Sequence, residues 1–139
     1  MTKLVLNSNG IWENGFALVR FITGIFLIVH GTQAFATEDM KGYAQWLTDL
    51  HVPLPAQMAY IGKGTELLGG LCLALGLFTR VATVLLIITF CFVTFVMGHG
   101  KIFTEDQHPF LFVLLNLIFL FVGPGRWSLD QPQRRRDAK

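Results

Sequence analysis

Residues 81–98 read VATVLLIITFCFVTFVMG, and this stretch contains no charged side chain. A transmembrane helix needs roughly 20 consecutive, mostly apolar residues, with a usual range of about 17–25. Three further apolar runs lie at 16–35, 56–78 and 108–123. Because lipid cannot satisfy free backbone N–H and C=O groups, each run is predicted to be a helix. The predicted fold class is an all-α membrane protein, a four-transmembrane-helix bundle that forms one domain over residues 1–139.

The composition supports a membrane protein. Apolar residues make up 53% of the chain and charged residues only 14%, whereas an ordinary soluble domain carries about 25% charged residues. The lipid bilayer is therefore the first expected partner. A basic tail over 126–139 could also suit nucleic acid, but after the last apolar run it is more simply a cytoplasmic anchor, and no nucleic-acid partner is predicted.

Positive charges are unevenly divided among the segments that join the apolar runs. With the N-terminus inside, the cytoplasmic segments hold Lys3, Arg80 and the basic tail over 126–139, whereas the two outer loops keep only Lys41 and Lys101. Loops rich in lysine and arginine remain on the cytoplasmic side of a membrane. This bias predicts that both termini are cytoplasmic.

The first apolar run has two features that bear on topology. Arg20 lies near its cytoplasmic end, where we expect it to snorkel to the surface and play a structural part. Ala34-Phe35-Ala36 resembles the cleavage site of a secretory signal. Such a leader would be long and only weakly basic, so a retained first helix is the favoured interpretation.

The first outer loop, over 37–55, is predicted to contain a short amphipathic helix. Its apolar and aromatic residues recur at helical spacing with polar residues between them; they are Met40, Tyr43, Trp46, Leu47 and Leu50. We expect this helix to lie at the outer membrane interface, with its two aromatic residues at headgroup level.

The second apolar run carries the strongest candidate for chemistry. Gly62, Gly69 and Gly76 recur every seven residues and are expected to form one closely packed helix face. Glu66 shares that face near mid-membrane, where a charged carboxyl costs about 2.5–3.5 kcal/mol on insertion scales. It is therefore a candidate proton carrier, or else a structural carboxyl that hydrogen-bonds neighbouring helices. Lys63, one turn away, could be its counter-ion or could snorkel outwards.

The histidines gather in the outer half of the predicted bundle. His30 ends the first apolar run with Gln33 one turn further out, His99 ends the third run, and His108 begins the fourth. Imidazoles hydrogen-bond carbonyl groups and titrate near neutral pH, so a site roofed by these histidines and Glu66 is reasonable. Alternatively, helix ends simply favour polar residues. There is no HExxH motif or His pair at i,i+4, so no metal site is predicted. The predicted catalytic residues are Glu66 and His30, and the predicted ligand-binding residues are Gln33, Lys63, His99 and His108.

Taken in order, several short motifs give the chain a resemblance to the DoxX family of small bacterial inner-membrane proteins. They are Leu18-Val19-Arg20, Gly24 and His30-Gly31-Thr32-Gln33 in the first run, Glu66-Leu67-Leu68-Gly69-Gly70 and Leu75-Gly76-Leu77-Phe78-Thr79-Arg80 in and after the second, and Gly123-Pro124-Gly125-Arg126-Trp127-Ser128-Leu129-Asp130 after the fourth. Ala34 departs from the family, which often has a lysine there. The resemblance implies a four-helix bundle in the bacterial inner membrane. It also implies a link to thiosulfate:quinone oxidoreduction, to quinone or catechol stress, or to membrane redox complexes.

These observations favour a redox-associated membrane subunit that binds a quinone-like lipid-soluble molecule. Such a subunit would belong to an oxidoreductase. In this hypothesis Glu66 manages a proton, while His30 and Gln33 hydrogen-bond the carbonyl. Quinone is the one cofactor suggested. A non-catalytic small-solute transporter and a scaffold subunit of a membrane complex are the alternatives. The expected protein partners are other members of a membrane redox complex or further copies of the chain.

Overall fold

The computed structural model describes residues 8–125 and 127–130, which form helices and contain no strand. The prediction of an all-helical fold is confirmed. The elements, in chain order, are α2 (Ser8–Gly31), the 3-10 turn η1 (Thr32–Phe35), α3 (Thr37–Asp49), α4 (Pro55–Leu75), α5 (Thr79–Phe92), the π-helical turn η2 (Val93–Met97) and α6 (Gln107–Val122). Of the basic tail predicted over 126–139, only 127–130 lie within the described residues.

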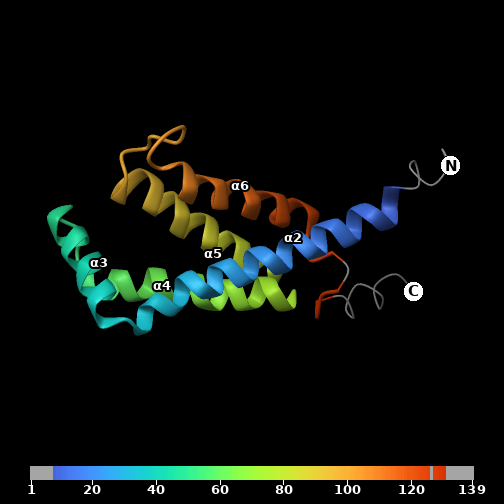
Figure 1. Cartoon of the computed structure of the whole chain (residues 1–139), viewed down its shortest axis with the longest axis horizontal. Coiled ribbons are helices and arrows are strands. Elements are labelled where there is room, and N and C mark those ends of the chain that lie inside the picture. The colour runs from blue at the N-terminus through green and yellow to red at the C-terminus, as the bar shows by residue number, and fades with distance from the viewer. Residues whose placement is uncertain (1–7, 126, 131–139) are drawn as a thin grey trace.

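The long helices form two pairs, α2 with α4 and α5 with α6, and α3 lies across one end of the bundle (Figure 1). We call this end the α3 end. Small residues bring α2 and α4 into backbone contact. A Cβ at Gly24 would lie 2.6 Å from the Ala74 backbone nitrogen, and one at Gly70 would lie 2.8 Å from the Gly24 carbonyl oxygen. Glycine at these positions therefore allows an approach that any side chain would prevent.

The glycine stripe predicted on α4 is wrong as a single packing face. Gly69 does pack against the Leu86 side chain of α5. Gly76, however, lies beyond the end of α4 with a φ of +66°, where its left-handed conformation terminates the helix. Among the described residues, nothing lies within 4 Å of the Cβ position at Gly62. The seven-residue spacing thus joins three glycines with three different roles.

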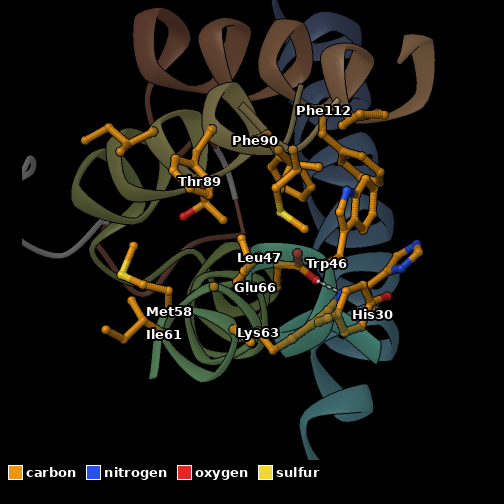
Figure 2. A pocket seen from close by; sticks show the side chains of 18 of the residues that line it. His30, Trp46, Leu47, Met58, Ile61, Lys63, Glu66, Thr89, Phe90 and Phe112 are labelled. Atoms are coloured by element: carbon orange, nitrogen blue, oxygen red, sulfur yellow. Dashed lines mark hydrogen bonds and ion pairs between the residues drawn. The ribbon is translucent and has the colours of Figure 1, made fainter. Parts of the chain in front are cut away.

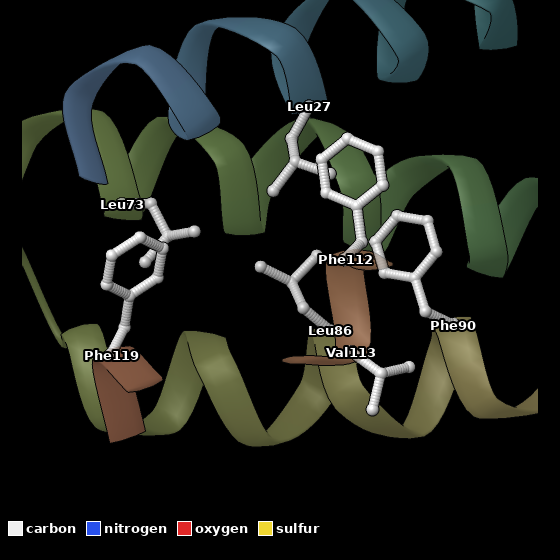
Figure 3. Packing of buried hydrophobic residues seen from close by; sticks show 7 residues of the cluster. All are labelled: Leu27, Leu73, Leu86, Phe90, Phe112, Val113 and Phe119. Atoms are coloured by element: carbon white, nitrogen blue, oxygen red, sulfur yellow. The ribbon is translucent and has the colours of Figure 1, made fainter. Parts of the chain in front are cut away.

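One apolar core joins both helix pairs (Figure 3). Leu27 of α2, Leu73 of α4 and Leu86 of α5 are all completely buried in it. The remaining members of the buried cluster are Phe90, Phe112, Val113 and Phe119. Because every long helix contributes to this core, the two pairs pack as one bundle.

Two helical segments of the described chain are long and apolar enough to cross a membrane, Trp12–Phe35 and Thr79–Met97. The outward faces of the bundle carry many exposed large apolar side chains, including Phe26, Ile88 and Phe121. α6 is apolar but has only 16 residues. α4 has 21 residues, yet charged and polar side chains interrupt it. The four-span arrangement therefore stays a prediction.

Arg20 does not snorkel, contrary to the prediction. Its residue surface is only 2% exposed. The Nε atom donates a hydrogen bond to the Leu73 carbonyl oxygen, and Nη2 donates one to the Trp127 carbonyl oxygen, each at 2.9 Å. The guanidinium therefore ties α2 to the end of α4 and to residues 127–130, so its structural role is that of a buried clasp.

Residues 127–130 fold back onto the α4–α5 turn. The Asp130 carboxylate accepts hydrogen bonds from the Phe78 and Thr79 backbone N–H groups at 2.9 and 3.1 Å, and from the Thr79 hydroxyl at 3.2 Å. Phe78 has a φ of 46°, an uncommon conformation for a bulky residue. The carboxylate at the first turn of α5 satisfies backbone donors and complements the helix dipole there.

The loop between η2 and α6 is organised by Asp106. Its Oδ2 accepts hydrogen bonds from the backbone N–H groups of Lys101 and His99, each at 2.9 Å. A Cβ at Gly98 would overlap the Asp106 carboxylate, so a glycine is needed beside it. The two backbone hydrogen bonds hold the pKa of the Asp106 carboxyl below its ordinary value of 3.8.

Replacing Asp106 by asparagine is expected to loosen this loop, because a neutral amide oxygen is a weaker acceptor than a carboxylate. Hydrogen exchange at the Lys101 and His99 amides should accelerate by about three- to tenfold at neutral pH. Since the folded pKa is lowered, the carboxylate stabilises the loop above its unfolded pKa, and the effect is lost as the pH falls through the folded value. The matched control is Glu105→Gln, which alters an exposed carboxylate of the same loop. Equal exchange in Asp106→Asn and the wild type would contradict this role.

Candidate functional site

A cavity of about 390 Å³ lies at the α3 end, between the two helix pairs (Figure 2). Most of its wall is apolar or aromatic, with Trp46 and Leu47 from α3, Phe90 from α5 and Phe112 from α6. Five titratable side chains interrupt that wall; they are His30 of α2, Tyr43 of α3, Lys63 and Glu66 of α4, and His108 of α6. A concave apolar site with a few convergent polar groups is typical of a small-molecule site.

Lys63 and Glu66 form a buried ion pair in the cavity wall. Lys63 Nζ donates to Glu66 Oε2 at 3.0 Å, and the two side chains are only 11% and 7% exposed. The i,i+3 spacing on α4 places both groups on one helix face. The Lys63 ammonium also lies 4.7 Å from the centre of the Tyr43 ring, a cation–π contact. Lys63 is therefore the counter-ion of Glu66 and does not snorkel outwards.

Two histidines meet in the cavity wall. The ring centres of His30 and His108 are 5.7 Å apart, although they come from α2 and α6. Phe112 packs against both rings, with centre distances of 6.2 Å to His30 and 5.3 Å to His108, and stacks on Phe90 at 5.0 Å. Glu66 and Lys63 are close enough to act electrostatically on His30. The structure thus brings His30, Lys63, Glu66 and His108 into one site.

Gln33 and His99 do not line this cavity. Gln33 Oε1 accepts a hydrogen bond from the Tyr43 hydroxyl at 3.1 Å, so it acts behind the wall by orienting Tyr43. The His99 side chain is exposed in the loop before α6, and its backbone N–H bonds to Asp106. Of the histidines predicted to share the site, His99 is therefore the one that lies outside the cavity wall.

The cavity is covered by α3, which the sequence interpretation placed at headgroup level. Tyr43, Trp46 and Leu47 of this helix line the cavity. Leu47 is 2% exposed and packs in a second apolar cluster with Met40, Ala59 and Met97. The amphipathic pattern of 37–55 contained the signal for this cover. It did not reveal that the apolar face of the helix packs on protein.

Within residues 8–125 and 127–130, no group of three or more His, Cys, Asp or Glu residues is arranged to hold a metal ion. Cys72 and Cys91 are both free thiols.

A helical bundle with two candidate membrane spans and a mainly apolar cavity between its helices is typical of a small helical membrane protein. The profile of the DoxX family matches residues 15–99, which is more than half of the chain. The protein belongs to the DoxX family.

Three relatives illustrate the family. A Bacillus subtilis (strain 168) protein with the name "Putative oxidoreductase CatD" is 40% identical over 81 residues, which cover 58% of this chain and 58% of that protein. An uncharacterized Haemophilus influenzae protein is 29% identical, with 82% of this chain and 87% of that protein covered. The uncharacterized membrane protein Rv3486 of Mycobacterium tuberculosis is 30% identical, with 85% and 80% covered. No solved structure shows a significant match to the chain.

Proposed function

We propose that the chain is a four-span protein of the bacterial inner membrane with both termini in the cytoplasm. The apolar outward faces of α2, α5 and α6 support burial in lipid. On this topology α4 crosses the membrane with its ion pair facing the bundle interior, as intramembrane charges generally do. The α3 end is then the outer end, and residues 127–130 lie at the cytoplasmic end.

We propose further that the cavity binds a quinone-like, lipid-soluble molecule. The observation that carries this proposal is the buried Lys63–Glu66 pair in a wall that is otherwise mainly aromatic and aliphatic. The pair has no net charge, so it favours a neutral ligand. Its ammonium can donate to a carbonyl oxygen, while rings such as Trp46 and Phe112 can pack against a planar ring. A volume of about 390 Å³ suits a ring-sized head group.

The polar residues divide into groups that can contact the ligand and groups that position others. Lys63 would donate a hydrogen bond to one carbonyl oxygen. Glu66 would accept a hydrogen bond from the Lys63 ammonium and would take up its proton when that proton is transferred. His30, with His108 beside it, would face the other carbonyl. Gln33 would act by fixing Tyr43 against Lys63.

A redox role requires electrons as well as protons. Reduction of a quinone to a hydroquinone takes up two electrons and two protons, and the side chains of the cavity can handle only the protons. We therefore propose a role as the quinone-binding subunit of an oxidoreductase complex, in which a partner protein supplies the electrons. The name of the Bacillus subtilis relative is compatible with this role.

Quinone content per protein after mild detergent purification tests the proposal. Wild-type protein is expected to retain close to equimolar quinone. His30→Ala should weaken binding by about tenfold, because one hydrogen bond to the ligand is worth about 1–1.5 kcal/mol. Gly62→Leu should abolish binding, because the Cβ of residue 62 points into open space in the cavity wall.

Gly42→Leu is the matched control for the cavity-filling variant. Gly42 lies on α3, is exposed, does not line the cavity, and has an equally open Cβ position among the described residues. Quinone retention should be unchanged in this variant. Well-folded wild-type protein that retains no quinone and binds none when it is added would overturn the proposal in favour of a transporter or scaffold.

A further inference from the structure

A second hollow, of about 480 Å³, lies between α4 and α5 on the outside of the bundle. We call it the α4–α5 groove. Ile61 lines both this groove and the cavity. On α5 the cavity wall includes Ile88 and the groove wall begins at Leu85, one turn away. The groove is thus a continuation of the cavity along the same two helices.

The groove is suited to an apolar chain. No charged residue is found among its described lining residues. The Thr65 hydroxyl, which lines it, already donates to the Ile61 carbonyl oxygen at 2.8 Å. Gly64 leaves part of the floor open, since no described atom lies within 4 Å of its Cβ position. The groove follows α4 from Ile61 to Cys72, a length of roughly 16 Å at ~1.5 Å rise per residue.

From this continuity, and resting on the function proposed above, we infer that the ligand carries a long apolar tail that leaves the cavity past Ile61 and lies in the α4–α5 groove. The cavity can hold a ring-sized head but not a long chain as well. The exposed Ile61 stands where the two hollows meet. The ligand class is therefore a membrane quinone with a polyprenyl or alkyl tail, rather than a small tail-free aromatic molecule.

A rival groove of about 360 Å³ lies between α2 and α6. It meets the cavity at His108 and Phe112, whose rings pack edge to face at 5.3 Å. A tail leaving by that route would have to separate these rings. The α4–α5 route passes only one flexible aliphatic side chain and an open glycine position, so it is the path that the packing favours.

The test compares two probes that share a head group, menadione without a tail and menaquinone with a polyprenyl tail. The full chain is placed in nanodiscs of phosphatidylethanolamine and phosphatidylglycerol, and binding is followed by quenching of tryptophan fluorescence against lipid mole fraction. Wild-type protein should bind menaquinone about tenfold more tightly than menadione. The gain is modest because lipid is as apolar as the groove, and only closer packing distinguishes them.

Gly64→Leu fills the groove and should raise the half-saturating mole fraction of menaquinone to that of menadione, leaving menadione binding unchanged. Gly64→Ala should give a smaller shift in the same direction. Val19→Phe, which fills the α2–α6 groove, should change neither ligand. A tenfold preference that survives Gly64→Leu, or one that Val19→Phe removes, would overturn the inference.

The two proposals fail in different ways. If wild-type protein binds menadione and menaquinone equally, the cavity function stands and the tail groove is rejected. If it binds neither, the proposed function falls and the groove inference falls with it.

Discussion

Removing the Glu66 carboxylate alone is expected to destabilise the protein by about 3–5 kcal/mol, because the Lys63 ammonium would be left buried without its partner. Both side chains are nearly inaccessible, so water cannot easily replace the lost contact. Glu66→Ala should therefore unfold at a markedly lower sodium dodecyl sulfate fraction, followed by circular dichroism. Its bound quinone should fall below detection. Glu66→Gln keeps the shape and one acceptor, so it should cost less stability while still weakening the ligand contact.

A double variant separates stability from function. Lys63→Met combined with Glu66→Leu replaces the ion pair by apolar groups of similar size, which is often neutral or stabilising. It should therefore recover most of the stability lost in Glu66→Ala. If the pair acts on ligand, quinone binding should stay lost in this well-folded protein. Full quinone binding by the double variant would mean that the pair is only a structural element.

Replacing Arg20 by alanine is expected to cost a similar amount, about 3–5 kcal/mol, for a different reason. The guanidinium is buried, hydrogen-bonded to Leu73 and Trp127, and close enough to Asp130 for an attractive charge interaction. Without it, residues 127–130 lose their tie to α2 and Asp130 loses its nearby positive charge. The same denaturation experiment measures the loss, and protease sensitivity after residue 125 should rise.

Arg20→Lys is the informative control, because lysine keeps the charge but not the planar fork that reaches two carbonyl oxygens at once. It should recover only part of the stability. Asp130→Asn should lie between the wild type and Arg20→Ala, since an amide can still accept from the α5 N-terminus. If Arg20→Ala has wild-type stability, the clasp is unimportant.

The helical fold was predictable because the apolar runs are long enough to span a membrane. In lipid the backbone groups of such a run must bond within the protein, and a helix achieves this. The ends of the helices were not. α2 begins at Ser8, two turns before the apolar run at 16, because polar residues continue a helix without adding to apolarity. α4 ends at Leu75, three residues short of the predicted end, because Gly76 adopts the left-handed conformation.

The candidate site was predictable in part, because the predicted topology placed His30, Glu66 and His108 in the same half of the bundle. The spacing of Lys63 and Glu66 on α4 allowed the ion pair to be foreseen as one of two options. The meeting of His30 and His108 depends on how α2 and α6 pack, which no local pattern contains. The cover by Trp46 depends likewise on the direction in which α3 leaves α2. Sequence spacing and topology placed these residues at one level of the bundle, whereas tertiary packing decides which of their side chains are in contact.

The Arg20 clasp has a consequence for how the protein is made. Its two carbonyl acceptors lie 53 and 107 residues further along the chain, so neither exists when the ribosome delivers α2 to the insertion machinery. An unpaired arginine costs about 2.5–3.5 kcal/mol on insertion scales at the centre of a membrane segment, and less near its ends. In the nascent chain, the Arg20 side chain therefore lacks one of its two acceptors until Trp127 has been synthesised. In the proposed four-span arrangement, final placement of the first helix would therefore follow synthesis of Trp127.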